Sequence, residues 1–231
     1  MANLQFNGFS NKAIEFLADL RANNDREWFQ EHKDDYERWV RGPALDFITA
    51  FSEPLTKFAP CFVAMPKKVG GSLMRPYRDI RFSRDKTPFK TNVGIQFRHE
   101  LGKDVHAPGY YFHFDPDSVF IGAGIWRPDS TSIGKIRAAI AENPAAWQRI
   151  LKNKRFKQHF ELGGSRLTRP PRGFAKDHAL IDDLKRKDFI AISNMGHRAL
   201  VSSSVVADVA AVFRSATPLM KFLCAAIEVP F

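Results

Sequence analysis

Cysteine and long apolar runs are scarce in this chain of 231 residues. The two cysteines, Cys61 and Cys224, are too few for a disulfide framework, which favours a reducing compartment and a cytoplasmic location. No uninterrupted apolar run approaches the ~18 residues of a membrane-spanning helix. Residues 1–10 lack the basic and apolar regions of a secretory signal, so we expect no membrane partner.

The common motifs of nucleotide, metal and hydrolase sites are absent too. The chain contains no G-x-x-x-x-G-K-[ST], no G-x-S-x-G, and no H-E-x-x-H, C-x-x-C or H-x-H spacing. Gly122 and Gly124 follow a predicted strand, but Arg127 and Pro128 stand where a dinucleotide site needs a third glycine and a helix. We expect these two glycines to let a covering helix approach the sheet. The sequence predicts no metal and no cofactor.

Positive charge is abundant, with 35 Lys+Arg against 25 Asp+Glu and a net charge of +10. It is unevenly distributed, because residues 1–66 carry −3, residues 67–128 carry +5 and residues 129–231 carry +8. The stretch 149–187, with twelve basic and four acidic side chains, accounts for all of the last excess. This division indicates an anionic partner for the basic body, although a basic surface also serves solubility.

The spacing of apolar residues changes twice along the chain. Residues 1–66 have helical spacing, with Ser10 as an N-cap and a second helix from Asn24 to a stop at Gly42-Pro43. Residues 67–128 alternate as strands, and residues 129–231 return to helices with one further strand. No linker marks a domain boundary. The order predicts a single α+β domain, with a mainly antiparallel central sheet covered by N-terminal and C-terminal helices.

Two parts of the strand-rich region are distinctive. Ile80 and Phe82 alternate with polar residues, which predicts a strand. Residues 110–114, the turn 115–118 and residues 119–126 predict a β-hairpin. Because the hairpin strands are apolar on both faces, we expect them at the centre of a sheet that helices cover.

The densest candidate for a ligand site is the segment GGSLMRPYRDIRFSRDKTPFKT, residues 70–91. Its six basic side chains outnumber its two acidic ones, and the planar arginine fork suits bidentate binding of phosphate or carboxylate. An Arg–Asp network that braces a loop is the structural alternative. The ligand-binding candidates are Arg75, Arg78, Arg81, Ser83, Lys86 and Lys90.

If the protein is an enzyme, a titratable group near these arginines would carry the proton transfer. The candidates are Asp79 or His113 as acid or base, with Tyr77 or Ser83 as an orienting hydroxyl. His99 and His106 precede His113 at intervals of seven residues, and we expect all three to be hydrogen-bonded histidines, not metal ligands. The sequence leaves open whether the protein is an enzyme.

Two other functions compete with a small anionic ligand. The basic stretch 149–187 includes Phe156 and Phe160 and follows Trp147, a combination that could bind a nucleic acid through its phosphates and bases. The acidic N-terminal helices or the Pro-rich loop 163–179 could instead bind a protein without catalysis. The oligomeric state is left open.

Several strings resemble the bacterial domain-of-unknown-function family 2461, a group of conserved hypothetical proteins. They are NNDREWF (23–29), RDIRFSRDKTPFKT (78–91), GKDVHAPGYYFH (102–113), RPPRGF (169–174), IDDLKRKDF (181–189) and PLMKFLCAAIEVPF (218–231). The chain has Arg84, Phe89 and Ala179 where the family more often has Lys, Tyr and Pro, and the second change removes a hydroxyl from the candidate site. The resemblance implies one domain with few insertions. It implies no activity, cofactor or catalytic residue.

Overall fold

The computed structural model describes residues 6–102 and 106–231; residues 1–5 and 103–105, the latter within GKDVHAPGYYFH, lie outside the described residues. Six strands form one sheet in the order β1-β2-β3-β4-β6-β5, and every neighbouring pair is antiparallel. They are β1 (Phe62–Val63), β2 (Val93–His99), β3 (Gly109–Phe114), β4 (Val119–Ile125), β5 (Glu161–Leu162) and β6 (Phe189–Met195). The hairpin predicted around residues 115–118 is the β3–β4 pair.

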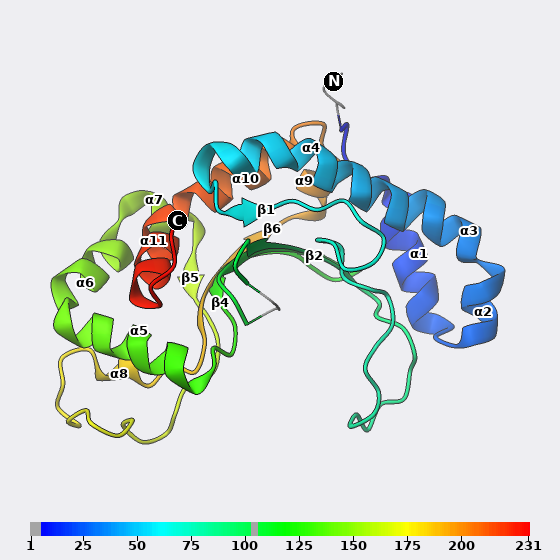
Figure 1. The fold of residues 1–231 in the computed structure, drawn as a ribbon. Helices are drawn as coiled ribbons and strands as arrows, with labels where there is room; N and C mark the ends of the chain where they lie inside the picture. Colours follow the sequence, from blue (N-terminus) through cyan, green and yellow to red (C-terminus); the bar gives the residue numbers. More distant parts are fainter. Residues whose placement is uncertain (1–5, 103–105) are drawn as a thin grey trace.

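Helices from both ends of the chain lie on the convex face of this sheet (Figure 1). The main ones are α4 (Gly42–Phe58) and α10 (Val205–Ser215). Phe47 of α4 packs against Phe112 at 5.1 Å between ring centroids, and Phe213 of α10 packs against Tyr110 at 4.9 Å. Full burial of each such ring contributes about 1.5–3 kcal/mol. The predicted single α+β domain, with an antiparallel sheet covered by N-terminal and C-terminal helices, is confirmed.

The N-terminal helices are α1 (Asn11–Ala22), α2 (Arg26–Glu31) and α3 (Lys33–Asp35), and Ser10 caps α1 by accepting the Lys12 N–H at 3.2 Å. The helix end expected at Gly42-Pro43 is wrong, because the chain remains helical there. A π-helical turn, η1 (Tyr36–Arg41), leads into α4, and the Gly42 N–H donates to the Glu37 carbonyl. Pro43 therefore stands in the first turn of α4, where its missing N–H costs no helical hydrogen bond.

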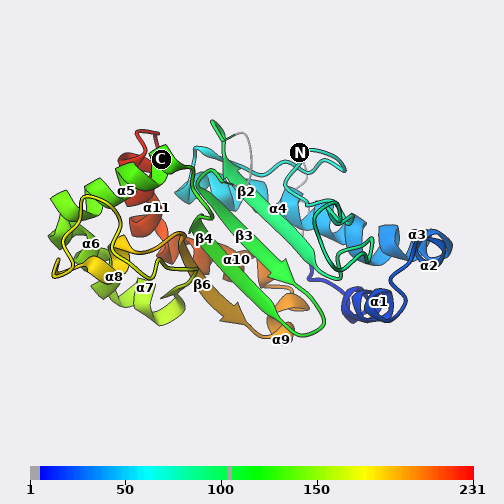
Figure 2. The same ribbon diagram turned by 90° about the horizontal axis from the view of Figure 1, so that it is seen from below.

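The other face of the sheet is concave and open. Along β3 and β4, Phe112 and Ile121 lie under the helices, whereas Tyr111 and Gly122 belong to the opposite face. Viewed from below, the strands are in sight, and no helix of the described residues crosses them (Figure 2). The hairpin strands are central and apolar on both faces as expected, but the helices from both ends of the chain share the convex side and leave this face without a covering helix.

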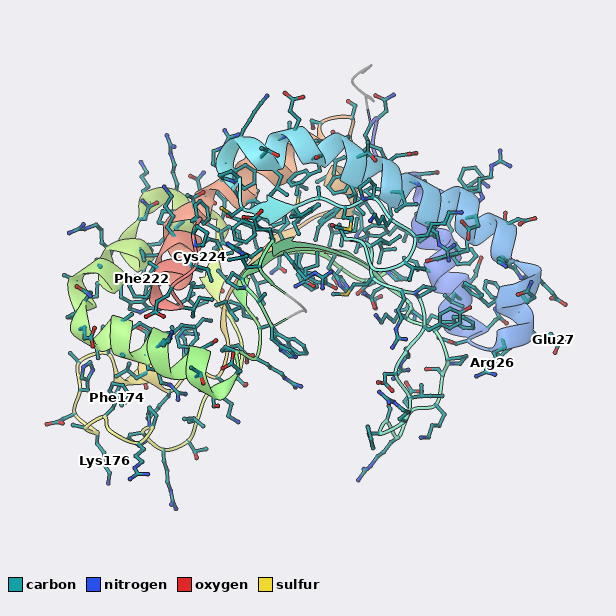
Figure 3. All side chains as sticks on the ribbon, viewed as in Figure 1. Arg26, Glu27, Phe174, Lys176, Phe222 and Cys224 are labelled. Carbon is teal, nitrogen blue, oxygen red and sulfur yellow. The ribbon has the colours of Figure 1, made fainter. Side chains whose placement is uncertain are left out.

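Two irregular segments extend from opposite ends of the arched sheet (Figure 1). The hairpin arm, residues 75–90, follows a bridge between Leu73 and Ile95 and is closed by a second bridge between Tyr77 and Phe89. The strand expected around Ile80 is wrong, because that part is a bend at the outer end without a neighbouring strand. The basic loop, residues 163–179, lies at the other end, where Figure 3 shows Phe174 and Lys176.

The remaining helices complete the core. They are α5 (Ser130–Glu142), α6 (Pro144–Lys152), α7 (Lys154–His159), α8 (Ile181–Leu184), α9 (His197–Leu200) and α11 (Thr217–Ala226). Of these, α9 lies beside α10, away from the basic loop (Figure 1). Trp147 of α6 packs against Phe222 of α11 at 5.3 Å between ring centroids. Within residues 6–102 and 106–231, no single helix has the length and apolar character of a membrane span, and α10 with α11 meets that test only as a pair bent by 53°.

Candidate functional site

The open face of the sheet contains a cavity of about 440 Å³. This volume falls in the range of small-molecule pockets. Its lining is mainly apolar and aromatic, and consists of Met74, Gln96, Gly109, Tyr111, Phe120, Gly122, Ala123, Gly124, Trp126, Ile190 and Ile192. The expectation that Gly122 and Gly124 admit a covering helix is wrong. Both line the cavity on the face without helices, and at Gly124 the missing side chain lets the β6 backbone approach, since a Cβ there would lie 2.0 Å from the Phe189 carbonyl oxygen.

Three side chains beside this cavity form a hydrogen-bonded chain. His113 Nε2 lies 2.8 Å from Asp115 Oδ2, and His113 Nδ1 lies 3.1 Å from the Tyr111 hydroxyl. Asn92 Nδ2 approaches the same Nδ1 at 3.4 Å. A carboxylate can only accept, so Nε2 carries the proton of a neutral imidazole. Nδ1 is then the acceptor toward Tyr111 and Asn92.

The β3–β4 turn holds Asp115 in its ionised form. Asp115 Oδ1 accepts the N–H groups of Asp117 and Ser118, each at 2.7 Å, and Oδ2 accepts the Ser118 hydroxyl at 3.1 Å. Burial alone would raise the pKa of Asp115. The hydrogen bonds from His113 and from the turn outweigh burial and lower that pKa. The carboxylate is therefore charged at neutral pH and fixes the imidazole behind Tyr111.

Tyr111 is the member of this chain that lines the cavity. Its hydroxyl lies above Gly94, where a Cβ atom would come within 2.6 Å of it. Burial, and secondarily the charge of Asp115, raises the pKa of Tyr111 to about 12. The phenol is therefore protonated at neutral pH, and its proton is directed at His113.

Two of the six basic side chains of the hairpin arm are paired with its two aspartates. Arg78 hydrogen-bonds to Asp85 and Thr87, and Arg81 forms a bidentate pair with Asp79 at 2.7 and 2.9 Å. These arginines hold the pKa of each aspartate at about 2. Both pairs correspond to the bracing network considered as the alternative to an anion site.

Arg75 and Lys90 differ from the other basic residues of the arm in their position. Both lie at its root, where the Lys90 N–H donates to the Pro76 carbonyl at 2.7 Å and Arg75 directly follows Met74 of the cavity. Burial first, and then the nearby charge of Arg75, lowers the pKa of Lys90. Within the described chain, neither side chain forms an ion pair or a hydrogen bond. Asp79 is near enough for Arg75 to contribute to its lowered pKa, but its carboxylate is bonded to Arg81.

The other predicted site residues of the arm lie further out. Tyr77 packs at 5.2 Å between ring centroids on Phe89 and is 52% exposed, and among the described residues its hydroxyl is not hydrogen-bonded to the His113 chain. Lys86 Nζ donates to the Ile80 carbonyl at 2.9 Å. Ser83 lies in the bend at the outer end, where its N–H approaches the same carbonyl at 3.4 Å.

The three evenly spaced histidines do not converge. His99 is 2% exposed, and its Nε2 lies 2.8 Å from the Pro230 carbonyl oxygen. His106 stacks on Trp126, with 5.6 Å between the ring centroids. Only His113 joins the chain that ends at Tyr111. Across residues 6–102 and 106–231, no group of three or more His, Cys, Asp or Glu side chains could hold a metal ion.

The basic stretch 149–187 does not form one continuous surface. Arg186 is 4% exposed and pairs with Asp183 at 3.0 Å, and Lys185 lies 3.9 Å from Asp182. Arg186 therefore braces the interior. The exposed basic side chains of the stretch lie on α6, α7 and the basic loop, and at Lys187.

The sequence analysis did not identify two residues of the hydrogen-bonded chain, Tyr111 and Asp115, as functional candidates. Tyr111 and His113 are expected to share one strand face, but Asp115 resembles an ordinary turn former in Asp-Pro-Asp-Ser. A signal was present, since Tyr111, His113 and Asp115 alternate at the end of one strand. Whether they face a cavity or a helix depends on the covering of the sheet, which periodicity does not determine.

Comparison with known proteins gives one match. The family model described as conserved hypothetical protein (DUF2461) matches residues 12–222, which include the cavity, the hairpin arm and the hydrogen-bonded chain. No curated protein and no solved structure matches the chain. With nearly its full length covered, the chain belongs to the DUF2461 family of conserved hypothetical proteins.

Proposed function

We propose that this protein binds a small anionic ligand, with a flat or apolar portion, in the cavity of the open sheet face. The observation that carries the proposal is the position of Arg75 and Lys90. They stand at the root of the hairpin arm, next to Met74 of the cavity, and no acidic side chain of the described residues is bonded to either.

The electrostatics favour an anion at this corner. Burial disfavours the ammonium of Lys90, and the positive charge of the exposed Arg75 nearby disfavours it further. A phosphate or carboxylate would relieve both effects, and the arginine fork could bind it through two parallel hydrogen bonds. The charged residues of the outer arm and the basic loop would raise the local concentration of such a ligand.

The cavity itself favours a ligand with a ring or another apolar portion. Tyr111, Phe120 and Trp126 offer aromatic surface, and Ile190 and Ile192 extend it along β6. A bare inorganic ion would leave this surface unused. We therefore expect an organic phosphate or carboxylate to bind more tightly than inorganic phosphate.

A thermal-shift screen followed by calorimetry tests the proposal. The probes are inorganic phosphate, a sugar phosphate, adenosine monophosphate and, as the uncharged match, adenosine. At ten times its Kd, a binding probe stabilises the protein by about 1.4 kcal/mol. Arg75→Gln and Lys90→Gln should each weaken binding at least tenfold, whereas Arg84→Gln, an equal charge loss on the exposed outer arm, should change it less than twofold. No stabilisation by any charged probe, or equal losses at Arg75 and Arg84, would refute the proposal.

A single-stranded nucleic acid is the second candidate. The observation in its favour is that the hairpin arm and the basic loop extend on opposite sides of the aromatic face (Figures 1 and 2). Such a strand would stack bases in the cavity and place phosphates against both segments. It predicts binding of an oligonucleotide that weakens steeply with salt and on reversal of Arg169 and Arg172 to Glu. Binding of a mononucleotide should respond to both changes much less, because it contacts neither Arg169 nor Arg172 and carries a single phosphate.

A further inference from the structure

Tyr111, His113 and Asp115 have the order of groups by which proteins activate a nucleophile: a hydroxyl, an imidazole that can take its proton, and a carboxylate that orients the imidazole. We propose that Tyr111 is a nucleophile, activated by His113 and Asp115, that attacks the carboxylic ester of an anionic substrate. The inference rests on the proposed ligand site, in that the substrate occupies the same cavity.

The direction of proton movement follows from the hydrogen bonds. Asp115 accepts from Nε2, so the unprotonated nitrogen of His113 is Nδ1, which faces the Tyr111 hydroxyl at 3.1 Å. The Asn92 amide approaches the same nitrogen as a donor at 3.4 Å. His113 is therefore arranged to receive the phenol proton.

The surroundings hold these groups in place. The imidazole stacks on Phe120 with ring centroids 4.3 Å apart and planes 18° apart, and the His113 side chain is only 12% exposed. Gly94 leaves the space that the Tyr111 hydroxyl occupies. Gln96 lines the same cavity, and its amide N–H groups are donors of the kind that stabilise a developing oxyanion.

A purely structural role would not require the contact between Tyr111 and His113. The β3–β4 turn is held by Asp115, which accepts from the backbone of Asp117 and Ser118. Tyr111 contributes none of these bonds. Its contact with His113 therefore adds little to the turn, but it directs the phenol proton to a base beside a cavity.

The proposed reaction is a hydrolysis in two steps. Tyr111 Oη forms a bond to the ester carbonyl carbon while its proton passes to His113 Nδ1, and the imidazolium returns that proton to the leaving alkoxide as the carbon–oxygen bond breaks. Water then attacks the tyrosyl ester, His113 takes a proton from the water, and the phenol leaves with that proton. The net change is one ester and one water converted to one acid and one alcohol.

Covalent labelling with benzenesulfonyl fluoride tests the nucleophile directly. The Tyr111 oxygen would form a bond to sulfur, fluoride would leave, and His113 would take the phenol proton. Peptide mass spectrometry locates the modified tyrosine and gives its rate. Tyr77 is the control within the same chain, because it is 52% exposed and no base among residues 6–102 and 106–231 is bonded to its hydroxyl.

We expect Tyr111 to be modified at least ten times faster than Tyr77 at neutral pH. His113→Gln and Asp115→Asn should slow Tyr111 at least tenfold and leave the Tyr77 rate unchanged, with circular dichroism and urea unfolding to show that each variant is folded. Tyr111→Phe should abolish modification at that site. Equal rates for Tyr111 and Tyr77, or a Tyr111 rate that does not respond to His113→Gln, would overturn the proposal.

A second probe separates this inference from the proposed ligand site. If the ligand site is correct, 4-carboxybenzenesulfonyl fluoride should modify Tyr111 faster than the uncharged probe, and Lys90→Gln should remove that advantage. Equal rates for the two probes, with full dependence on His113, would support the nucleophile and count against the anion site. A preference for the charged probe without dependence on His113 would support the anion site and count against the nucleophile.

Discussion

The side-chain amide of Asn24 pairs with the backbone of Phe89 as a neighbouring strand would. Asn24 Nδ2 donates to the Phe89 carbonyl, and the Phe89 N–H donates to Asn24 Oδ1, both at 3.0 Å. Asp25, and not the expected Asn24, caps α2 by accepting the Trp28 N–H at 2.9 Å. Asn24 is therefore available to tie the N-terminal helices to the hairpin arm, 65 residues along the chain.

Asn24→Ala should destabilise the protein by about 1–3 kcal/mol, because it leaves a backbone donor and acceptor of the arm without partners. Urea unfolding measures this loss, and hydrogen exchange should show faster exchange in residues 75–90. Asn11→Ala, at an exposed position in α1, is the control and should change neither measurement. Equal exchange of the arm in both variants would contradict this role of Asn24.

Gly124→Ala should cost about 3 kcal/mol or more. Gly124 has a φ of +137°, and a Cβ atom there would lie 2.0 Å from the Phe189 carbonyl oxygen of the neighbouring strand. Gly134→Ala is the matched change in α5, where a Cβ meets nothing within 4 Å, and it should stabilise by about 0.5–1 kcal/mol. Chemical unfolding of both variants checks the opposite signs. A tolerated alanine at Gly124 would show that β4 and β6 pack less closely than described.

Asp188→Asn should destabilise the protein in a pH-dependent way. The buried carboxylate accepts the Ser165 N–H and hydroxyl at 2.9 and 2.8 Å and the Arg127 N–H at 2.9 Å. Burial alone would raise the pKa of Asp188, but these bonds outweigh it and lower that pKa below 3.8. A carboxyl whose folded pKa is lowered contributes stability above its unfolded pKa and loses it as pH falls through the folded value.

The difference in unfolding free energy between wild type and Asp188→Asn should therefore be about 1.5–3 kcal/mol near pH 7 and shrink below about pH 4. Urea unfolding at several pH values measures it. Asp177→Asn, in the exposed part of the basic loop, is the control and should show a small difference at every pH. A constant difference for Asp188→Asn would contradict the charged hydrogen-bonded form.

Lys90→Met should raise the Tm of the ligand-free protein by about 1–3 °C, although the proposed function gives Lys90 a role in binding. Burial first and then Arg75 lowers the pKa of Lys90, so methionine removes an unfavourable charge and keeps the apolar stem. Lys67→Met, at an exposed lysine, is the control and should leave the Tm unchanged. Differential scanning calorimetry makes the comparison, and a lower Tm for Lys90→Met would show that Lys90 is stabilising without a ligand.

Much of the fold follows from local patterns that act through neighbouring residues. The β3–β4 hairpin is predictable because an Asp-Pro-Asp-Ser turn separates two apolar runs, and α11 is predictable because Pro218 follows Thr217 at a helix start. The helix end expected at Gly42-Pro43 is not observed, because the π-helical turn before it places Pro43 in the first turn of the next helix, where a proline is tolerated.

The candidate site was less predictable from the sequence than the fold was, and the reason is the same for each arginine of the arm. The abundance of arginine in residues 70–91 is visible in the sequence, but its pairing is not. In the folded arm Arg78 and Arg81 are bonded to aspartates, whereas Arg75 stands beside Lys90. The partner of each guanidinium depends on how the arm folds back on itself.

The sequence by itself determined the class of fold, the acidic N-terminal third, the basic body, and the placement of Tyr111 and His113 on one strand face, because each depends on composition or on spacing within one segment. Only the tertiary structure decided that helices from both ends share one face of the sheet. That choice leaves Tyr111 beside an open cavity, with Asp115 and His113 behind it. Strand periodicity distinguishes two faces, but which face is buried depends on helices that pack from distant parts of the chain.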